Sequence, residues 1–271
     1  MIGGMRPTPL SLSVFYAAVC AAALIGAVRH PVYAQETPSA NRVVEQLQQG
    51  RPAMGTFTRT ARPGLDFAVI DEQYGDFDID GVRDAVVAIR AGGGRAVASA
   101  TGQAAAPVVR IPLAARDTPE AVVRQVLAAG ATGVMFPDIE TRAQAISAVN
   151  SMRIGRAGGA DVWPLDPDGT LVAMLQIETL LGIENLDEIL DVPGIGVIFL
   201  GPTDLATSAG EDGPNAPRID ELVHQVLEAC IERDIPCGYP IVASSPEDAE
   251  RQTAQRLAEG FKVLAVMTRA R

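Results

Sequence analysis

The sequence predicts a (β/α)8 barrel of the TIM type. Eight short runs rich in β-branched and apolar residues recur along the chain, and amphipathic helical patterns lie between most of them. Short joints containing glycine or proline connect the two kinds of segment, which favours parallel strands joined by helices. Eight such strands favour a closed barrel over an open sheet. At 271 residues, the chain is long enough for one domain of this class.

The predicted strands cover residues 53–58, 65–71, 106–112, 132–137, 171–178, 196–201, 235–241 and 261–267. Helical patterns cover residues 41–50, 78–92, 118–130, 141–153, 183–191, 218–234 and 245–260. The joint "RTARPG" after the first strand is too short for a crossover helix, and only "TRAR" follows the last strand. We therefore expect an irregular barrel without a helix after strand 1 and without a final helix. Residues 154–169 show no periodicity and are predicted to form a long loop.

Residues 1–34 differ in character from the rest of the chain. A short start with Arg6 precedes the apolar stretch "LSLSVFYAAVCAAALIGAV", and Val32 and Ala34 occupy the small-residue positions of a cleavage site. We expect a signal peptide at 1–34 with cleavage near Ala34, a linker with a short helix at 35–52, and the barrel at 53–271. The protein would then be exported, periplasmic or secreted. An uncleaved transmembrane anchor is the alternative, because the stretch approaches the roughly 20 residues that span a bilayer.

Composition excludes some partners. The formal net charge is −11, and it becomes −13 without residues 1–34, which contain two arginines and no acidic residue. Such a charge does not suit nucleic acid or an anionic membrane surface. Cys230 and Cys237 remain, and without a histidine cluster they do not indicate a zinc site. Two buried thiols and a disulfide both stay open for this pair.

Polar residues follow the predicted strands where the carboxyl ends of barrel strands meet at one mouth. Gln176 and Glu178 are two residues apart, so in a strand they share one face. Close carboxylates repel each other unless a cation or a proton lies between them, and oxygen ligands suit Mg²⁺ or Mn²⁺ better than zinc. Glu178 and Asp204 form the best pair of metal-ligand candidates. The alternative for each acid is a helix cap or a surface charge. The full set at the strand ends is Asp71, Arg110, Asp138, Gln176, Glu178 and Asp204.

Arg110 lies in the otherwise apolar strand "VVRIP". A planar guanidinium suits a substrate carboxylate or a developing enolate oxygen. The alternative is an internal ion pair with Asp71 or Asp138.

Several segments together resemble the HpcH/HpaI aldolase and citrate lyase family, whose members are metal-dependent class II aldolases acting through pyruvate-type enolates. The resemblance runs from about Met54 to Met267 and is carried by "APVVRIP", "GATGVMFPDIETRAQAISAV", "MLQIETLLGIENLDEILDVPGIGVIFLGPTDLATSAG" and "PEDAERQTAQRLAEGFKVLAV". It implies that Glu178 and Asp204 bind a divalent cation, Mg²⁺ or Mn²⁺ with Co²⁺ as a further option, and that Gln176 lies beside them. It also implies that Arg110 contacts the keto or enolate oxygen and that the backbone of Gly201 and Pro202 lines the pocket.

One motif departs from the family pattern. The family has "D-x-E-H-G" after its second strand, and its histidine takes part in proton transfer, whereas this chain has "DEQYG". Gln73 and Tyr74 therefore replace the acid and the histidine. Tyr74 could donate a proton but is a poor base at neutral pH, and Asp71 or Asp138 could act through water. His224 is predicted to lie on an outer helix, and "GRAGGA" is weaker than the family's basic glycine-rich stretch.

These features predict a metal-dependent carbon–carbon lyase of the aldolase type, acting on a 2-oxo acid or hydroxy-oxo acid through a metal-stabilised enolate. One alternative is an exported binding protein that captures a small oxo acid without turning it over. Another is an oxaloacetate-decarboxylase-like activity, which needs no aldol base. The expected partner is a small-molecule oxo acid, with no nucleic acid and no membrane after signal cleavage. A homo-oligomer stays open, since family members commonly pack their last helix against a neighbouring subunit.

Overall fold

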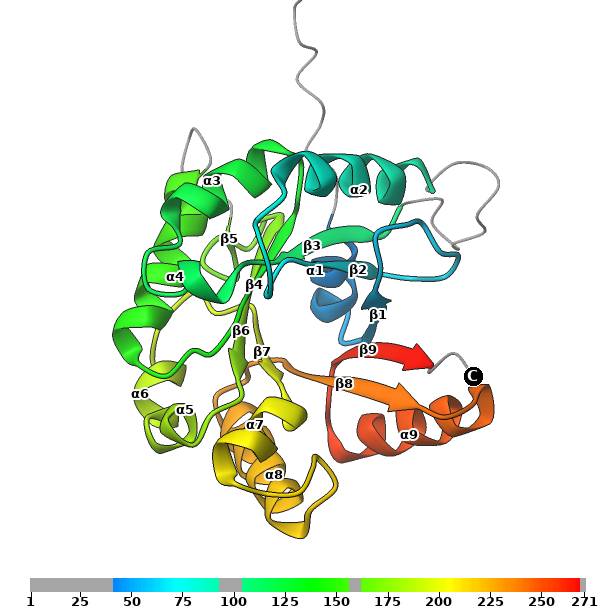
Figure 1. Ribbon diagram of the computed structural model, residues 1–271, viewed down its shortest axis with the longest axis vertical. Coiled ribbons are helices and arrows are strands. Elements are labelled where there is room, and N and C mark those ends of the chain that lie inside the picture. The colour runs from blue at the N-terminus through cyan, green and yellow to red at the C-terminus, as the bar shows by residue number, and fades with distance from the viewer. Residues whose placement is uncertain (1–40, 93–103, 156–161, 269–271) are drawn as a thin grey trace, which may run out of the picture. The chain divides into compact units, whose positions relative to one another are not determined.

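The computed structural model describes residues 41–92, 104–155 and 162–268. Within them, eight parallel strands form a closed barrel with helices around it, which confirms the predicted fold class (Figure 1). The ring closes because β1 pairs with both β2 and β9, and β4 pairs with β6. The strands of the ring are β1 (Ala53–Phe57), β2 (Phe67–Asp71), β3 (Ala106–Arg110), β4 (Gly133–Phe136), β6 (Leu171–Ile177), β7 (Val197–Leu200), β8 (Cys237–Ala243) and β9 (Val263–Thr268).

A two-residue strand, β5 (Val162–Trp163), pairs with the start of β6 in addition to the ring. It falls inside the segment predicted as a long loop, and α4 (Arg142–Gly155) also enters that segment. The loop prediction is therefore wrong at these positions, because two residues are too few to show the alternation that marks a strand. Residues 156–161 of the same segment lie outside the described ranges.

Helices cover the outside of the ring. The prediction of no helix between β1 and β2 is confirmed, since residues 58–66 contain none. One helix predicted at 183–191 is instead two short helices that meet at Asn185, whose side-chain Nδ2 donates to the carbonyl of Glu140 at 2.8 Å. The helices are α2 (Ile79–Ala91), α3 (Glu120–Ala128), α4, α5 (Leu180–Glu184), α6 (Leu186–Leu190), α7 (Pro202–Ala209), α8 (Pro217–Glu232) and α9 (Pro246–Glu259), with a 3₁₀ turn at Leu113–Ala115.

Helix α7 is not among the helices that the sequence pattern predicts. Pro202 stands at its start and Gly210, with φ of 70°, ends it. Proline at the first helical position and glycine just past the end are ordinary helix signals. The helix has eight residues, so its apolar pattern is too short to stand out. Its first turn carries Asp204.

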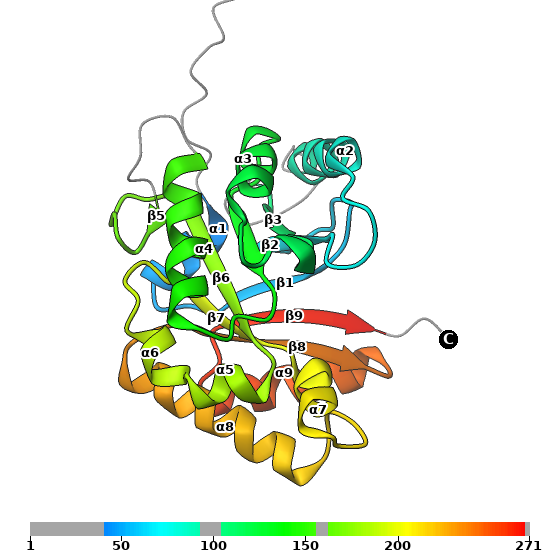
Figure 2. The ribbon, with the colours of Figure 1, turned by 60° about the vertical axis from the view of Figure 1, so that its left-hand side comes forward.

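The predicted short helix at 41–50 is present as α1 (Arg42–Gln48), at the end of the barrel where the strands begin (Figure 2). The Nδ2 of Asn41 donates to the carbonyls of Thr132 and Thr170, both at 2.9 Å, while its Oδ1 caps the helix. Val43 and Val44 join the apolar cluster inside the barrel. Helix α1 thus closes the amino-terminal end of the ring and leaves the carboxyl end as the mouth.

Alternation along the strands fills the interior below the mouth. Side chains two residues apart share one face of a strand, and the inward positions carry apolar groups. Each fully buried Val, Met or Phe contributes roughly 1.5–3 kcal/mol, so this packing gives the mouth a rigid floor. The interior cluster includes Phe67, Val69, Val108, Met135, Val172, Met174, Val197, Phe199, Val263 and Ala265.

Two sequence expectations concern regions away from the mouth. Cys230 and Cys237 are both buried and are free thiols, and burial, with Cys230 close by, raises the pKa of the Cys237 thiol. No helix in the ranges that the structure describes is long and apolar enough to cross a membrane. The apolar stretch at 10–28 and the expected cleavage site near Ala34 lie outside those ranges.

Candidate active site

Of the polar residues expected at the strand ends, all but Asp138 line one cavity of about 270 Å³ at the mouth. The last residues of β2 and β3, Asp71 and Arg110, are Cα partners in the parallel register, so the sheet itself brings them together. Gln176 lies near the end of β6 and Glu178 follows it directly. Gly201 and Pro202 join β7 to α7 and also line the cavity, as does Asp204.

Arg110 forms a two-pronged ion pair with Asp71. Its Nε donates to Oδ1 at 2.8 Å and its Nη2 to Oδ2 at 2.5 Å, and its guanidinium lies over the Phe57 ring, 4.9 Å from the ring centre. The internal ion pair, one of the alternatives for Arg110, is therefore present. It leaves room for an anion, because the guanidinium has five N–H donors and Asp71 accepts two of them. Burial tends to raise the pKa of Asp71, but the hydrogen bonds and charge of Arg110 lower it below its usual range.

Glu178 is 1% exposed, an unusual position for a carboxyl group. Its Oε1 accepts a hydrogen bond from the backbone N–H of Asp138 at 3.1 Å, and its Oε2 accepts one from Nε2 of Gln176 at 2.9 Å. Asp138 has a φ of 47°, in the left-handed region that non-glycine residues rarely adopt. Glycine is required at position 201, next to Glu178, because a Cβ at that position would overlap Oε2 of Glu178.

Negative charge accumulates around this carboxyl group. Burial, with smaller contributions from the carboxyl groups of Asp138 and Asp204, raises the pKa of Glu178 to about 9, against the lowering effect of the hydrogen bond from the Asp138 N–H. Burial and the charge of Asp138 also raise the pKa of Asp204, while Arg110 lowers it. A site that disfavours its own ionised carboxylates favours either protons or a cation.

The donor set fits a hard divalent cation. Glu178 and Asp204 supply carboxylate oxygens, and Oε1 of Gln176 is buried with no hydrogen-bond partner in the described chain. No cluster of three or more His, Cys, Asp or Glu side chains with metal-binding geometry occurs among the described residues. Zinc sites commonly use three or four such ligands, whereas Mg²⁺ is commonly held by one or two carboxylates plus water and substrate. These residues therefore suit Mg²⁺ or Mn²⁺ and do not suit a structural zinc site.

The residues considered for proton transfer are placed differently. Tyr74 is 69% exposed and is not among the residues that line the cavity. Partial burial and the charges of Asp204 and Glu178 raise its pKa, so its phenol stays protonated at neutral pH. Gln73 is buried, with its Oε1 unpartnered within the described ranges. His224 lies on α8 with its Nδ1 2.8 Å from the carbonyl oxygen of Asp220, as expected for an outer-helix residue.

Sequence reasoning missed part of the cavity wall. Apolar side chains line it beside the polar ones: Phe199 and Leu200 come from β7, and four more come from the carboxyl ends of β1, β8 and β9. The available signal was the two-residue alternation at the ends of those strands, which places them on the inward face. These residues are Phe57, Pro240, Val242 and Met267.

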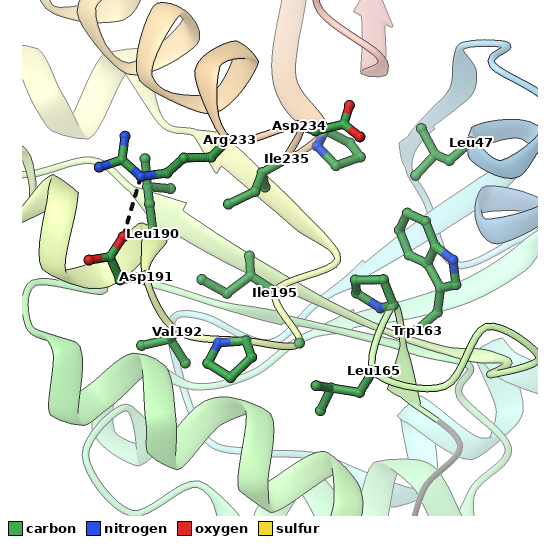
Figure 3. A pocket seen from close by; sticks show the side chains of 14 residues that line it. Leu47, Trp163, Leu165, Leu190, Asp191, Val192, Ile195, Arg233, Asp234 and Ile235 are labelled. Atoms are coloured by element: carbon green, nitrogen blue, oxygen red, sulfur yellow. Dashed lines mark hydrogen bonds and ion pairs between the residues drawn. The ribbon is translucent and has the colours of Figure 1, made fainter.

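A larger cavity, of about 510 Å³, lies at the opposite end of the barrel, next to the starts of β7 and β8 (Figure 3). Leu47, Trp163 and Leu165 contribute to its wall. Arg233 reaches it but is bonded to Asp187 at 2.8 Å and to Asp191 at 3.5 Å. Barrel enzymes place their chemistry at the carboxyl ends of the strands, so we assign the candidate site to the smaller cavity at the mouth.

The chain is similar to known proteins in sequence and in fold. The family model described as HpcH/HpaI aldolase/citrate lyase matches residues 63–266. The hydroxypyruvate/pyruvate aldolase of Rhizorhabdus wittichii is 31% identical over 210 residues, which cover 70% of this chain and 76% of that protein. The 5-keto-4-deoxy-D-glucarate aldolase of Salmonella paratyphi A is 27% identical and covers 69% of this chain and 73% of its own. A crystal structure of an HpcH/HpaI family protein from Burkholderia cenocepacia superposes with a TM-score of 0.67 at 22% identity, covering 84% of this chain and 93% of that one.

Replacing Gly201 with alanine tests the close packing at Glu178. The added methyl group would overlap Oε2 of Glu178, so we expect Gly201→Ala to lower the free energy of unfolding by about 1–3 kcal/mol. Gly213→Ala is the matched control, because a Cβ there meets no atom within 4 Å and the residue has no positive φ. Chemical denaturation measures both variants. Equal stabilities of the two variants would contradict the packing described here.

The pH dependence of stability tests the burial of Glu178. Its pKa is about 9 in the folded protein against an ordinary value of 4.5, so between these pH values the folded state holds a proton that the unfolded state releases. In metal-free protein, the free energy of unfolding should therefore fall as pH rises through this range. Relative to Glu178→Gln, the fall should approach about 1.4 kcal/mol per pH unit. Denaturant titrations between pH 5 and 9, in roughly unit steps, measure this fall. If the free energies of unfolding of wild type and Glu178→Gln change in parallel with pH, the effect of burial is ruled out.

Proposed function

Because this chain belongs to the HpcH/HpaI aldolase/citrate lyase family, we propose that it is a divalent-metal-dependent aldolase that cleaves a hydroxy-oxo acid to a 2-oxo acid and an aldehyde. The relatives named as aldolases support an aldolase-type lyase. The observation that carries the metal-dependent part is the buried carboxyl group of Glu178, which faces a cavity shared with Asp204 and Arg110.

Glu178 and Asp204 are the residues proposed to hold the cation, with Gln176 orienting Glu178 through the 2.9 Å hydrogen bond. Bound Mg²⁺ or Mn²⁺ would supply Lewis-acid stabilisation of the negative charge that develops on the oxo acid. Co²⁺ fits the same oxygen donors as a further option. The family's aldolases are typically dependent on divalent metals, which agrees with this donor set.

Arg110 is proposed to bind the oxo acid through the N–H groups that Asp71 does not use. Asp71 and the Phe57 ring hold the guanidinium in place, so little reorganisation is needed when charge develops on the enolate oxygen. The backbone at Gly201 and Pro202 forms the adjacent wall. In the cleavage step, the bond between C3 and C4 breaks, its electron pair becomes the enolate, and the C4 hydroxyl gives up its proton.

Asp71 is the proposed acceptor of that hydroxyl proton, through a water molecule. Its lowered pKa keeps it ionised at neutral pH, and its side chain is 40% exposed at the mouth, within reach of water. Tyr74, with its raised pKa, is suited to donating a proton rather than accepting one, and since it does not line the cavity it would reach the enolate carbon only through water. Asp138 is a second candidate for a water-mediated acceptor.

A second candidate function is decarboxylation of oxaloacetate, for which no hydroxyl proton has to be removed. The observation that favours it is the position of Tyr74, since this residue stands where the family pattern has its histidine and its phenol lies outside the cavity wall.

The exported location, the oxo-acid partner and the absence of nucleic-acid and membrane partners are proposals drawn from the sequence. A binding protein without turnover is the remaining alternative.

Substitution of the proposed metal ligands tests the function. With Mn²⁺ present, we expect wild-type protein to form pyruvate from a panel of 4-hydroxy-2-oxo acids. Glu178→Gln and Asp204→Asn should each lower kcat/KM by roughly 10²-fold or more, because each removes a carboxylate ligand of the cation that would stabilise the developing enolate. His224→Gln is the control, since His224 lies on an outer helix. A coupled lactate dehydrogenase assay measures pyruvate.

Three results, from that assay or from parallel measurements, would count against the proposed aldolase or its site. Oxaloacetate loss above the rate with free metal, with no cleavage of any hydroxy-oxo acid, would favour the decarboxylase. Metal-dependent thermal stabilisation by pyruvate without any product would favour the binding protein. Full activity in Glu178→Gln would exclude the proposed site.

A further inference from the structure

We propose that the carbon chain of the aldehyde half of the substrate is apolar and uncharged. This inference rests on the proposed function and concerns the same cavity. Its basis is the division of the mouth into a polar arc and an apolar arc, each built by neighbouring strands.

The polar arc is formed where the inward faces of β2, β3 and β6 reach the mouth. On each of these strands, the inward positions are apolar inside the barrel and polar at the last position. In β2, Phe67 and Val69 precede Asp71, and in β6, Val172 and Met174 precede Gln176. With Glu178 and Asp204, these residues surround the place assigned to the carboxylate and oxo groups.

The apolar arc lies on β1, β9 and β8, which are neighbours in the sheet (Figure 1). Their inward faces stay apolar up to the mouth. Ala53 precedes Phe57 on β1, and Val263 and Ala265 precede Met267 on β9. On β8, Pro240 and Val242 line the cavity, while Tyr239 and Ile241 point into the layer below the helices.

Val242 is 46% exposed, an unusual exposure for a valine at the wall of a cavity. A ligand that covers Val242 and Met267 would remove apolar surface from water. Each CH2 group buried in this way strengthens binding by roughly fourfold. A hydroxyl group in the same place would lose its water without a hydrogen-bond partner from this arc. A carboxylate there would lose still more hydration, because this arc offers it neither a cationic side chain nor a hydrogen-bond donor.

The cavity size limits the aldehyde. At about 270 Å³, the cavity at the mouth is slightly smaller than most ligand pockets, which measure roughly 300–1,000 Å³. It must hold the oxo-acid portion as well, so the geometry points to a short alkyl or branched alkyl aldehyde.

A matched pair of substrates tests this inference with the full chain and Mn²⁺. 4-Hydroxy-2-oxohexanoate carries an ethyl group where 4,5-dihydroxy-2-oxopentanoate carries a hydroxymethyl group of nearly the same size. We expect kcat/KM to favour the ethyl compound by about tenfold or more. Val242→Thr, which keeps the shape and adds a hydroxyl group, should reduce that ratio several-fold. Val87→Thr makes the same change on the exposed face of α2 and should leave the ratio unchanged.

Calorimetric titration of the same two compounds separates this inference from the proposed function. If neither compound is cleaved but the ethyl compound binds more tightly, the proposed function fails and the apolar subsite stands. Equal or reversed preference in both turnover and binding would overturn the subsite. A changed oligomeric state of Val242→Thr with an unchanged substrate ratio would also overturn it, because the apolar arc would then be a subunit contact.

Discussion

The buried carboxyl group of Glu178 is the constraint on which the rest of the site depends. A carboxyl group that is 1% exposed, with two further acids close by, is stable only when a proton or a cation offsets its charge. Several local features hold this carboxyl group in its buried position. The amide of Gln176 and the backbone N–H of Asp138 each bond one oxygen, Asp138 adopts a left-handed backbone conformation, and Gly201 leaves the necessary space.

The barrel register turns this constraint into a site. Parallel pairing places Asp71 opposite Arg110, and pairing of β4 with β6 brings Asp138, two residues after β4, next to Glu178. The turn from β7 into α7 then carries Gly201, Pro202 and Asp204 to the same place. Because α1 closes the other end of the ring, the polar groups gather at the single mouth where barrel enzymes place their chemistry.

Much of this arrangement could be predicted from the sequence. The eight strands follow from short runs of β-branched and apolar residues, and Gln176 and Glu178 are expected on one face because they are two residues apart in one predicted strand. Strand β5 and helix α7 could not be found in the same way, because two residues and eight residues give too little periodicity. Asn185 divides one predicted helix through a contact with Glu140, which is distant in the sequence. The apolar arc could not be predicted without knowing which strands are neighbours. Whether Arg110 forms an ion pair or binds an anion could not be decided without the position of Asp71.

The central claim is that the mouth holds a divalent cation between Glu178 and Asp204. Diffraction data from crystals soaked in Mn²⁺ and collected at the manganese absorption edge would test it most directly. The account predicts an anomalous peak within coordination distance of both carboxylates, roughly 2.0–2.4 Å, and loss of that peak in Glu178→Gln. A map with no peak at the mouth, or with manganese bound only elsewhere on the protein, would contradict it.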